Sequence, residues 1–414
     1  MIFNEGYGAC PDTSYITRAQ GSRVWDNAGR AMIDLALGGG SMILGHADPE
    51  VAGAIERQAG MGTIYTAPHR AVHEMDEALG RFIPWLPGRV WCNSGSEAVM
   101  RLCRIARTVT GRDKIAIFSG CWHGSGNDTL VEEDYGTTAD GCKVSMKLRS
   151  PGILDQIKHS LLMLPYRDYS AMNLIHEHRR ELACVLIEPV QGSNPRDDAG
   201  MFLAGLRRIC SDSGVLLAMD EVVTGFRLAP GGGQEHFGVR ADLAAYGKIL
   251  GGGLPVGMVA GTQAIMDKAR AAGVFFGGTF SANPLTIAAS LATLRRLHAY
   301  RLVIYSHLEG AGSLLRDTVN AACLELNLPA RMIGCNSISR LLLTGQTVGS
   351  RRERDQLEPP AAVQDRFYST LRDRGLHIGA NRILFLSAVH DVADVMTVAG
   401  MIVDAVSKFG WKGE

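Results

Sequence analysis

Two short apolar runs, each ending in ionisable side chains, constrain this chain more than any other part of its sequence. The first run, residues 215–219, ends at Asp220 and Glu221, and the second, residues 243–246, ends at Gly247 and Lys248. Short apolar runs bounded by glycine are typical of buried parallel strands. Ligands of open α/β sheets bind beyond the carboxyl ends of such strands, so we expect Asp220 and Lys248 to face one site.

The surroundings of Lys248 indicate a reactive amine. Glycines and apolar residues flank it, and a lysine kept away from water loses its proton readily. A neutral amine can attack an aldehyde and form a Schiff base. A carboxylate such as Asp220 can hold the proton on the ring nitrogen of pyridoxal phosphate (PLP). A solvated lysine and a solvated acid pair are the alternative for each residue alone, but the joint pattern favours the catalytic interpretation.

Composition indicates a globular enzyme. A chain of 414 residues, 46% of them hydrophobic and 20% charged, allows two or three domains with a sizeable core. The formal net charge is zero, so nothing favours nucleic acid or an anionic membrane as a partner.

Location and metal binding are predicted from what the sequence lacks. Its start has no basic segment followed by an apolar core, which predicts no signal peptide, and no apolar run reaches about 18 residues, which predicts no membrane span. The nine cysteines form no CxxC pair, as expected of buried free thiols in the cytoplasm. The twelve histidines show no HExxH spacing, so we predict no metal.

A second group of polar residues precedes a helical pattern. Apolar residues recur with helical spacing after Ser96, which places Ser94, Gly95 and Ser96 at a helix N-terminus. Free backbone N–H groups there can bind an anion. A capping box formed by Ser94 and Glu97 is the alternative that these residues alone allow.

Two further apolar runs predict strands. Residues 114–118 lead to Trp122 and His123, and residues 182–187 lead to Glu188 and Gln191. Residues 131–160 are polar and without clear periodicity, so we predict a long loop that is a lid or a disordered segment.

These strings together resemble the class III (ω-type) aminotransferases of PLP fold type I. The matching strings are DEVVTGFR, GKILGGGLPVG, NSGSEA, CWHG, EPVQG and GTFSANP, and the resemblance runs over most of the chain. Their wording is nearest to that of the family's glutamate-1-semialdehyde 2,1-aminomutases. The resemblance implies an α/β fold with a mostly parallel central sheet in a large PLP-binding domain, residues 48–298. Residues 1–47 and 299–414 would form a small α+β domain from both chain ends.

The resemblance also implies a role for each site residue. Lys248 would bind the cofactor covalently and carry the substrate's Cα proton, and Asp220 would keep the ring nitrogen protonated. Other residues would bind the cofactor: Gly95 and Ser96 at the phosphate, Trp122 and Val222 on opposite faces of the ring, His123, and Glu188 and Gln191 near O3′. Thr279 would reach the phosphate in the other subunit, which implies a homodimer with shared active sites.

The implied function is amino-group transfer from an amine or amino acid to a keto or aldehyde acceptor. Intramolecular transfer of the aminomutase type is the alternative, and the Asp220–Lys248 pair disfavours a non-catalytic binding protein. The chain lacks a glutamate that family aminomutases carry in the segment aligned with residues 381–384, which favours the aminotransferase. Arg382 is the candidate for binding a substrate carboxylate, and a solvated arginine at a strand start is its alternative.

Overall fold

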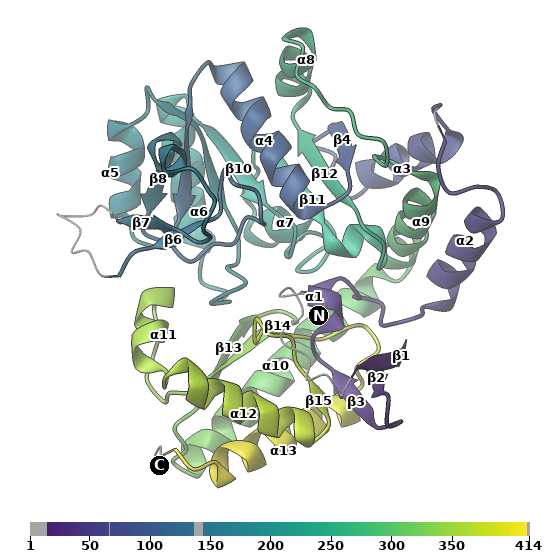
Figure 1. Cartoon of the computed structure of the whole chain (residues 1–414), viewed down its shortest axis with the longest axis vertical. Helices are drawn as coiled ribbons and strands as arrows, with labels where there is room; N and C mark the ends of the chain where they lie inside the picture. Colours follow the sequence, from purple (N-terminus) through teal and green to yellow (C-terminus); the bar gives the residue numbers. More distant parts are fainter. Residues whose placement is uncertain (1–14, 66, 136–143, 412–414) are drawn as a thin grey trace. The chain divides into compact units, whose positions relative to one another are not determined.

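The computed structural model describes residues 15–65, 67–135 and 144–411, which form two compact units (Figure 1). The large unit consists of Glu50–Gly192 and Asp198–Ala299. The small unit contains the described residues of Met1–Pro49, Ser193–Asp197 and Tyr300–Glu414. Each unit has a hydrophobic core of its own.

A seven-stranded sheet forms the centre of the large unit. Its strands in spatial order are β4 (Gly88–Cys92), β12 (Gly257–Gly261), β11 (Leu243–Gly247), β10 (Leu216–Asp220), β9 (Leu182–Ile187), β5 (Lys114–Phe118) and β8 (Leu161–Leu164). Strands β11, β10, β9, β5 and β8 pair in parallel, and β12 is antiparallel to both of its neighbours. The predicted α/β fold with a mostly parallel sheet is confirmed.

Helices cover both faces of this sheet, because its strands carry apolar side chains on alternating sides. Helix α4 (Gly95–Thr110) packs against one face, next to Ile117, Leu186 and Ala245 (Figure 1). Helices α5 (Ser170–Glu177) and α6 (Gly200–Ser213) pack against the other face. The unit also contains α2 (Pro49–Ala59), α3 (Arg70–Gly80), α7 (Gly232–Phe237), the 3₁₀ helix η3 (Lys248–Gly251), α8 (Gln263–Ala271) and α9 (Pro284–Ala299).

The described parts of the segment 131–160 contain secondary structure where a long loop was predicted. Strands β6 (Val131–Glu133) and β7 (Met146–Leu148) pair in antiparallel fashion, and η2 (Asp155–Ser160) follows. The prediction of a plain loop is therefore wrong for these parts. Each of these strands has three residues, which is too short for a periodic pattern to reveal. Residues 136–143 lie outside the described residues.

The small unit combines two small sheets with helices. One sheet has the order β1 (Ile16–Gln20), β2 (Arg23–Asp26), β3 (Ala31–Asp34) and β15 (Leu376–His377), and the other has β13 (Arg331–Cys335), β14 (Ile338–Leu342) and β16 (Leu384–Phe385). The helices are α1 (Leu37–Gly40), α10 (Arg301–Glu325), α11 (Arg351–Leu357), α12 (Ala361–Asp373) and α13 (Val392–Lys408). None of the described helices in either unit combines the length and the apolar character that a bilayer crossing requires.

Helix α10 packs so closely on the β13–β14 turn that Gly312 leaves no room for a side chain. A Cβ atom there would overlap the backbone oxygen of Asn336, which also accepts a hydrogen bond from Nη1 of Arg316 at 2.7 Å. We expect Gly312→Ala to destabilise the protein by about 1–3 kcal/mol, because the helix must shift. Gly310 lies on the same helix with nothing within 4 Å of a Cβ.

Gly310→Ala is therefore the matched control for this prediction. It should raise stability by about 0.5–1 kcal/mol through helix propensity alone. Thermal denaturation of both variants measures the difference. Equal midpoints for the two variants would contradict the close packing of α10 on the turn.

Candidate active site

The carboxylate of Asp220 is fixed at the end of β10. Its side chain is 4% exposed; Oδ2 lies 2.8 Å from Nδ1 of His123, and Oδ1 accepts the backbone N–H of Val222 at 3.1 Å. The His123 ring is also buried, and among the described residues its Nε2 has no hydrogen-bond partner. These contacts hold the carboxylate in one orientation. His123 thus contacts Asp220, a pairing that the sequence reading did not predict.

Lys248 follows the neighbouring strand β11 and begins η3. Its backbone adopts φ 48°, a left-handed conformation that is uncommon for a residue with a long side chain. Burial lowers the pKa of the Lys248 ammonium, and the charges of Glu188 and Asp220 oppose that shift. The structure therefore brings together a lysine and two acids that the sequence places 60 and 28 residues before it.

Glu188 follows β9 and lies between the Asp220 strand and the segment after β5. Oε2 accepts the backbone N–H of Trp122 at 2.8 Å, and Oε1 accepts that of Gly192 at 3.4 Å. Burial, with repulsion from Asp220, raises the pKa of Glu188 to about 7. Glu188 therefore changes charge near neutral pH. Gln191 binds the backbone oxygen of Ser119 through Nε2 at 2.7 Å, so it supports this segment.

The second acid of the first motif has a different role. Glu221 is fully buried and accepts backbone N–H groups of Gly233 and Gln234, each at 2.9 Å, and a hydrogen bond from the hydroxyl of Thr224. It therefore anchors the loop that leads into α7. Of the adjacent acids, only Asp220 contacts His123.

The N-terminus of α4 lies next to Val222 and Gly247, the neighbours of Asp220 and Lys248. Ser94 caps the helix by accepting the N–H of Glu97 at 3.1 Å, so this half of the capping box exists. Glu97 Oε2 instead accepts the N–H of Asn93, the residue before the cap, at 2.7 Å. Gly95 and Ser96 begin the first turn. The Ser96 hydroxyl accepts the N–H of Ser125 at 3.0 Å. Capping and anion binding use different groups, so the first does not exclude the second.

Two glycines allow the segments around the start of α4 to approach one another closely. A Cβ on Gly95 would lie 2.9 Å from Val222 Cγ1, and a Cβ on Gly124 would overlap Ser96. Trp122 precedes His123, yet its side chain remains 45% exposed. The indole of Trp122 is therefore accessible next to the buried His123–Asp220 pair.

Thr279 lies on an exposed turn that Arg101 holds in place. Arg101 is 5% exposed on α4; its Nη1 donates to the backbone oxygens of Trp91 and Phe276, each at 2.7 Å, and Nη2 donates to that of Gly277 at 2.9 Å. The sequence reading missed Arg101. Its signal is a positive charge on the apolar face of an amphipathic helix, three residues after Ala98.

Arg382 lies in the small unit, whereas the residues around Lys248 belong to the large unit. Nη2 of Arg382 pairs with Asp365 Oδ1 at 2.5 Å, Nη1 donates to Gln364, and the guanidinium carbon lies 5.4 Å from the Tyr368 ring centre. Neighbours on α12 therefore already hold this guanidinium.

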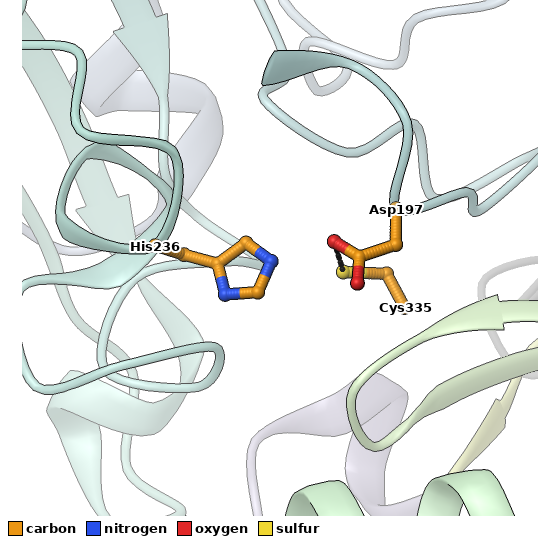
Figure 2. A group of neighbouring side chains, drawn as sticks. All are labelled: Asp197, His236 and Cys335. Carbon is orange, nitrogen blue, oxygen red and sulfur yellow. Dashed lines mark hydrogen bonds between the residues drawn. The ribbon is translucent and has the colours of Figure 1, made fainter.

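Two side chains of the small unit in Figure 2 carry metal-binding atom types. The thiol of Cys335 donates to Asp197 Oδ1 at 3.3 Å, and the third side chain drawn, His236, belongs to α7 of the large unit (Figure 2). Burial, reinforced by Asp197, raises the pKa of the Cys335 thiol, whereas a metal ligand must be a thiolate. The absence of a resident metal remains a prediction.

Residues 6–319 match the family described as aminotransferase class-III. The chain belongs to this family. It is 34% identical to a glutamate-1-semialdehyde 2,1-aminomutase of Desulfitobacterium hafniense, over 92% of this class-III chain and 88% of that protein. Among solved structures it is similar to an ω-transaminase of Sphaerobacter thermophilus, with TM-score 0.90, 30% identity and coverage of 98% and 93%.

A third similarity bears on the cofactor. A glutamate-1-semialdehyde aminomutase of Pseudomonas aeruginosa in complex with PMP has TM-score 0.86 and 25% identity, covering 98% of this chain and 89% of that one. Together with the family match, these similarities show PLP fold type I and a PLP-dependent enzyme. The residues present fit that cofactor. Asp220 offers a fixed carboxylate, Lys248 a partly buried amine, and His123 a buried Nε2 that has no hydrogen-bond partner among the described residues.

The raised pKa of Glu188 predicts a pH-dependent stability. Glu188 binds its proton more tightly in the folded protein, with a pKa of about 7, than at its ordinary value of 4.5. Its effect on stability is therefore neutral below pH about 4.5, grows more unfavourable as the pH rises to about 7, and is constant above that. We expect Glu188→Gln to remove a loss of about 1.4 kcal/mol per pH unit across this window.

Denaturant unfolding of the cofactor-free protein at several pH values measures this difference. Glu177→Gln, on the exposed part of α5, is the control for the substitution itself. A wild-type-minus-variant difference for Glu188→Gln that does not change with pH would contradict the assigned burial.

Proposed function

We propose that this class-III enzyme moves an amino group from an amine or amino acid donor to a keto or aldehyde acceptor, with Lys248 as the covalent attachment point of PLP. The partly buried Lys248 amine, whose pKa burial lowers and the charges of Glu188 and Asp220 raise, is the observation that carries this proposal. Burial favours the neutral amine, which is the nucleophilic form.

PLP supplies an aldehyde for amino groups and a ring that withdraws electrons from a Cα bond. The chain's residues would do the rest. Asp220, oriented by His123 and the Val222 N–H, would hold a proton at the ring nitrogen. Lys248 would accept and return the Cα proton, since a lowered pKa makes the neutral, proton-accepting amine easier to form.

Further residues would position the cofactor. Gly95 and Ser96 would bind its phosphate at the N-terminus of α4, because the first backbone N–H groups of a helix have no partner within the helix. Trp122 and Val222 would contact opposite ring faces, and Glu188 with Gln191 would line the O3′ side. The exposed indole and the narrow Gly95–Val222 approach support these roles.

Intramolecular amino transfer is the second candidate. The relatives at about 34% identity are named glutamate-1-semialdehyde 2,1-aminomutase, and this supports it. The similarity in fold to an ω-transaminase, and the missing glutamate near residues 381–384, support the aminotransferase.

Arg382 is proposed as one candidate for binding a substrate carboxylate. Its guanidinium already contacts Asp365 and Gln364, so a substrate carboxylate would have to replace the Asp365 contact. Asp365 is 71% exposed, which makes that exchange inexpensive compared with opening a buried pair.

A homodimer that shares its active sites is a further part of the proposal. Thr279 lies on a turn beside Phe275 and Phe280, whose side chains are 72% and 61% exposed. Large apolar side chains gathered in one exposed segment support a protein contact there. A cytoplasmic location is proposed from the seven described cysteines, all of which are free thiols.

A half-reaction tests amino transfer. We expect enzyme loaded with pyridoxamine phosphate to recover the yellow PLP absorbance when a suitable keto acid or aldehyde is added, and to release one equivalent of aminated product. Absorbance and product analysis measure both. Catalytic conversion of a single substrate, without a second donor or a lasting change in the cofactor, would contradict the aminotransferase and support the aminomutase.

Lys248→Ala is the control for that experiment. It should retain cofactor, because the phosphate and Asp220 contacts remain, but lose about a thousandfold or more in turnover. Borohydride treatment of the wild type should attach the cofactor to the peptide that contains Lys248. Attachment to another peptide would overturn the role of Lys248.

Complementation tests the shared site. We expect Lys248→Ala and Thr279→Ala homodimers to be weak, and a co-expressed heterodimer of the two to recover activity. One of its two sites then has Lys248 from one subunit and Thr279 from the other. Rates of the doubly tagged heterodimer measure the gain. No gain over the two homodimers would show that Thr279 serves its own subunit or no site.

A further inference from the structure

We infer that Arg149, held over the ring of Trp122, binds the carboxylate of an amino-acid or keto-acid substrate. This assignment rests on the proposed function, which it deepens by naming a substrate class. The guanidinium carbon of Arg149 lies 4.7 Å from the centre of the Trp122 ring, as in a cation–π contact. Both residues belong to the large unit.

Trp122 connects Arg149 to the reacting groups. Its backbone N–H donates to Glu188 at 2.8 Å, and the next residue, His123, lies 2.8 Å from Asp220. The backbone of Trp122 is therefore fixed beside both acids, while its side chain is 45% exposed. A cation on that exposed ring lies at the accessible side of the site.

The guanidinium of Arg149 has N–H groups available for a ligand. Among the described residues it forms an ion pair with Glu132, whose Oε2 lies 4.0 Å from Nε, the outer limit of such a pair. The other oxygen of Glu132 pairs with Lys147 at 3.3 Å. Within the described part of the chain, no hydrogen bond of this guanidinium is observed, and its side chain is 37% exposed. The planar guanidinium can therefore donate two parallel hydrogen bonds to the oxygens of a carboxylate.

Its position is nevertheless defined. The N–H of Arg149 donates to the backbone oxygen of Leu130 at 3.2 Å, directly after the β6–β7 pairing of Val131 with Leu148. An arginine placed by a strand pair and by a ring loses less conformational entropy on binding than a free surface arginine.

The charges around Lys248 explain why such a group is needed. Glu188 and Asp220 would repel a substrate carboxylate, so a nearby cation must compensate. Arg227 affects the pKa of Lys248 but is fully buried. Arg149 is the exposed alternative, and unlike Arg382 it has no hydrogen bond to any side chain that the structure describes.

Binding of propionate and of its neutral analogue propionamide to the holoenzyme tests this inference. Ligand-observed NMR titration should show that the wild type prefers propionate, and that Arg149→Met weakens propionate binding about ten- to a hundredfold while propionamide binding is unchanged. Lys147→Met, which removes the other cation paired with Glu132, should change either affinity by about twofold or less. Arg149→Lys should give an intermediate loss, because it keeps the charge but not the fork.

Three outcomes overturn the inference. The first is a wild type that does not distinguish the two ligands, and the second is equal loss of both ligands in Arg149→Met. The third is a propionate-specific loss in Arg382→Ala with none in Arg149→Met, which assigns the carboxylate to Arg382. Amino transfer from uncharged amines should persist in Arg149→Met. A wild type that transfers no amino group at all would refute the proposed function and not this inference.

Discussion

The partial burial of one lysine close to two carboxylates is the interaction on which the rest of this structure depends. Removal from water favours a neutral Lys248 amine, whereas Glu188 and Asp220 favour its charged form. The two effects oppose each other, which keeps the amine able to accept and release a proton. The same burial raises the pKa of Glu188 to about 7, so the pair of acids does not carry its full charge near neutrality. The chemistry proposed for the enzyme follows from this balance.

The sheet makes that arrangement possible. Strands β9, β10 and β11 are neighbours and run parallel, so their carboxyl ends lie side by side. Glu188, Asp220 and Lys248 lie at these ends. Close backbone approach then narrows the site, because Gly95 allows Val222 to approach the start of α4. The architecture supplies geometry that no single segment contains.

Substrate choice and assembly depend on segments outside the sheet. The β6–β7 pair carries Arg149 to the ring of Trp122, and Arg101 fixes the turn that presents Thr279. Both arginines act through long side chains that span from one element to another. Members of a family with a common core can therefore differ in substrate through such contacts, while the core chemistry stays the same.

The sequence by itself determined the fold class, strands β5 and β9, the start of α4 and the strand ends that carry Asp220 and Lys248. Apolar runs and capping residues are local signals, so they can be recognised without tertiary structure. The family resemblance identified the cofactor.

Only the tertiary structure decided which side chains meet. His123 contacts Asp220 across 97 residues of sequence, whereas Glu221, adjacent to Asp220, is buried as the anchor of the following loop. The contacts of Arg101 and Arg149 likewise have no local sequence signal, and neither does the strand pair within 131–160. Such contacts join elements distant in the chain, and their energies depend on burial and orientation, which a local sequence pattern does not encode.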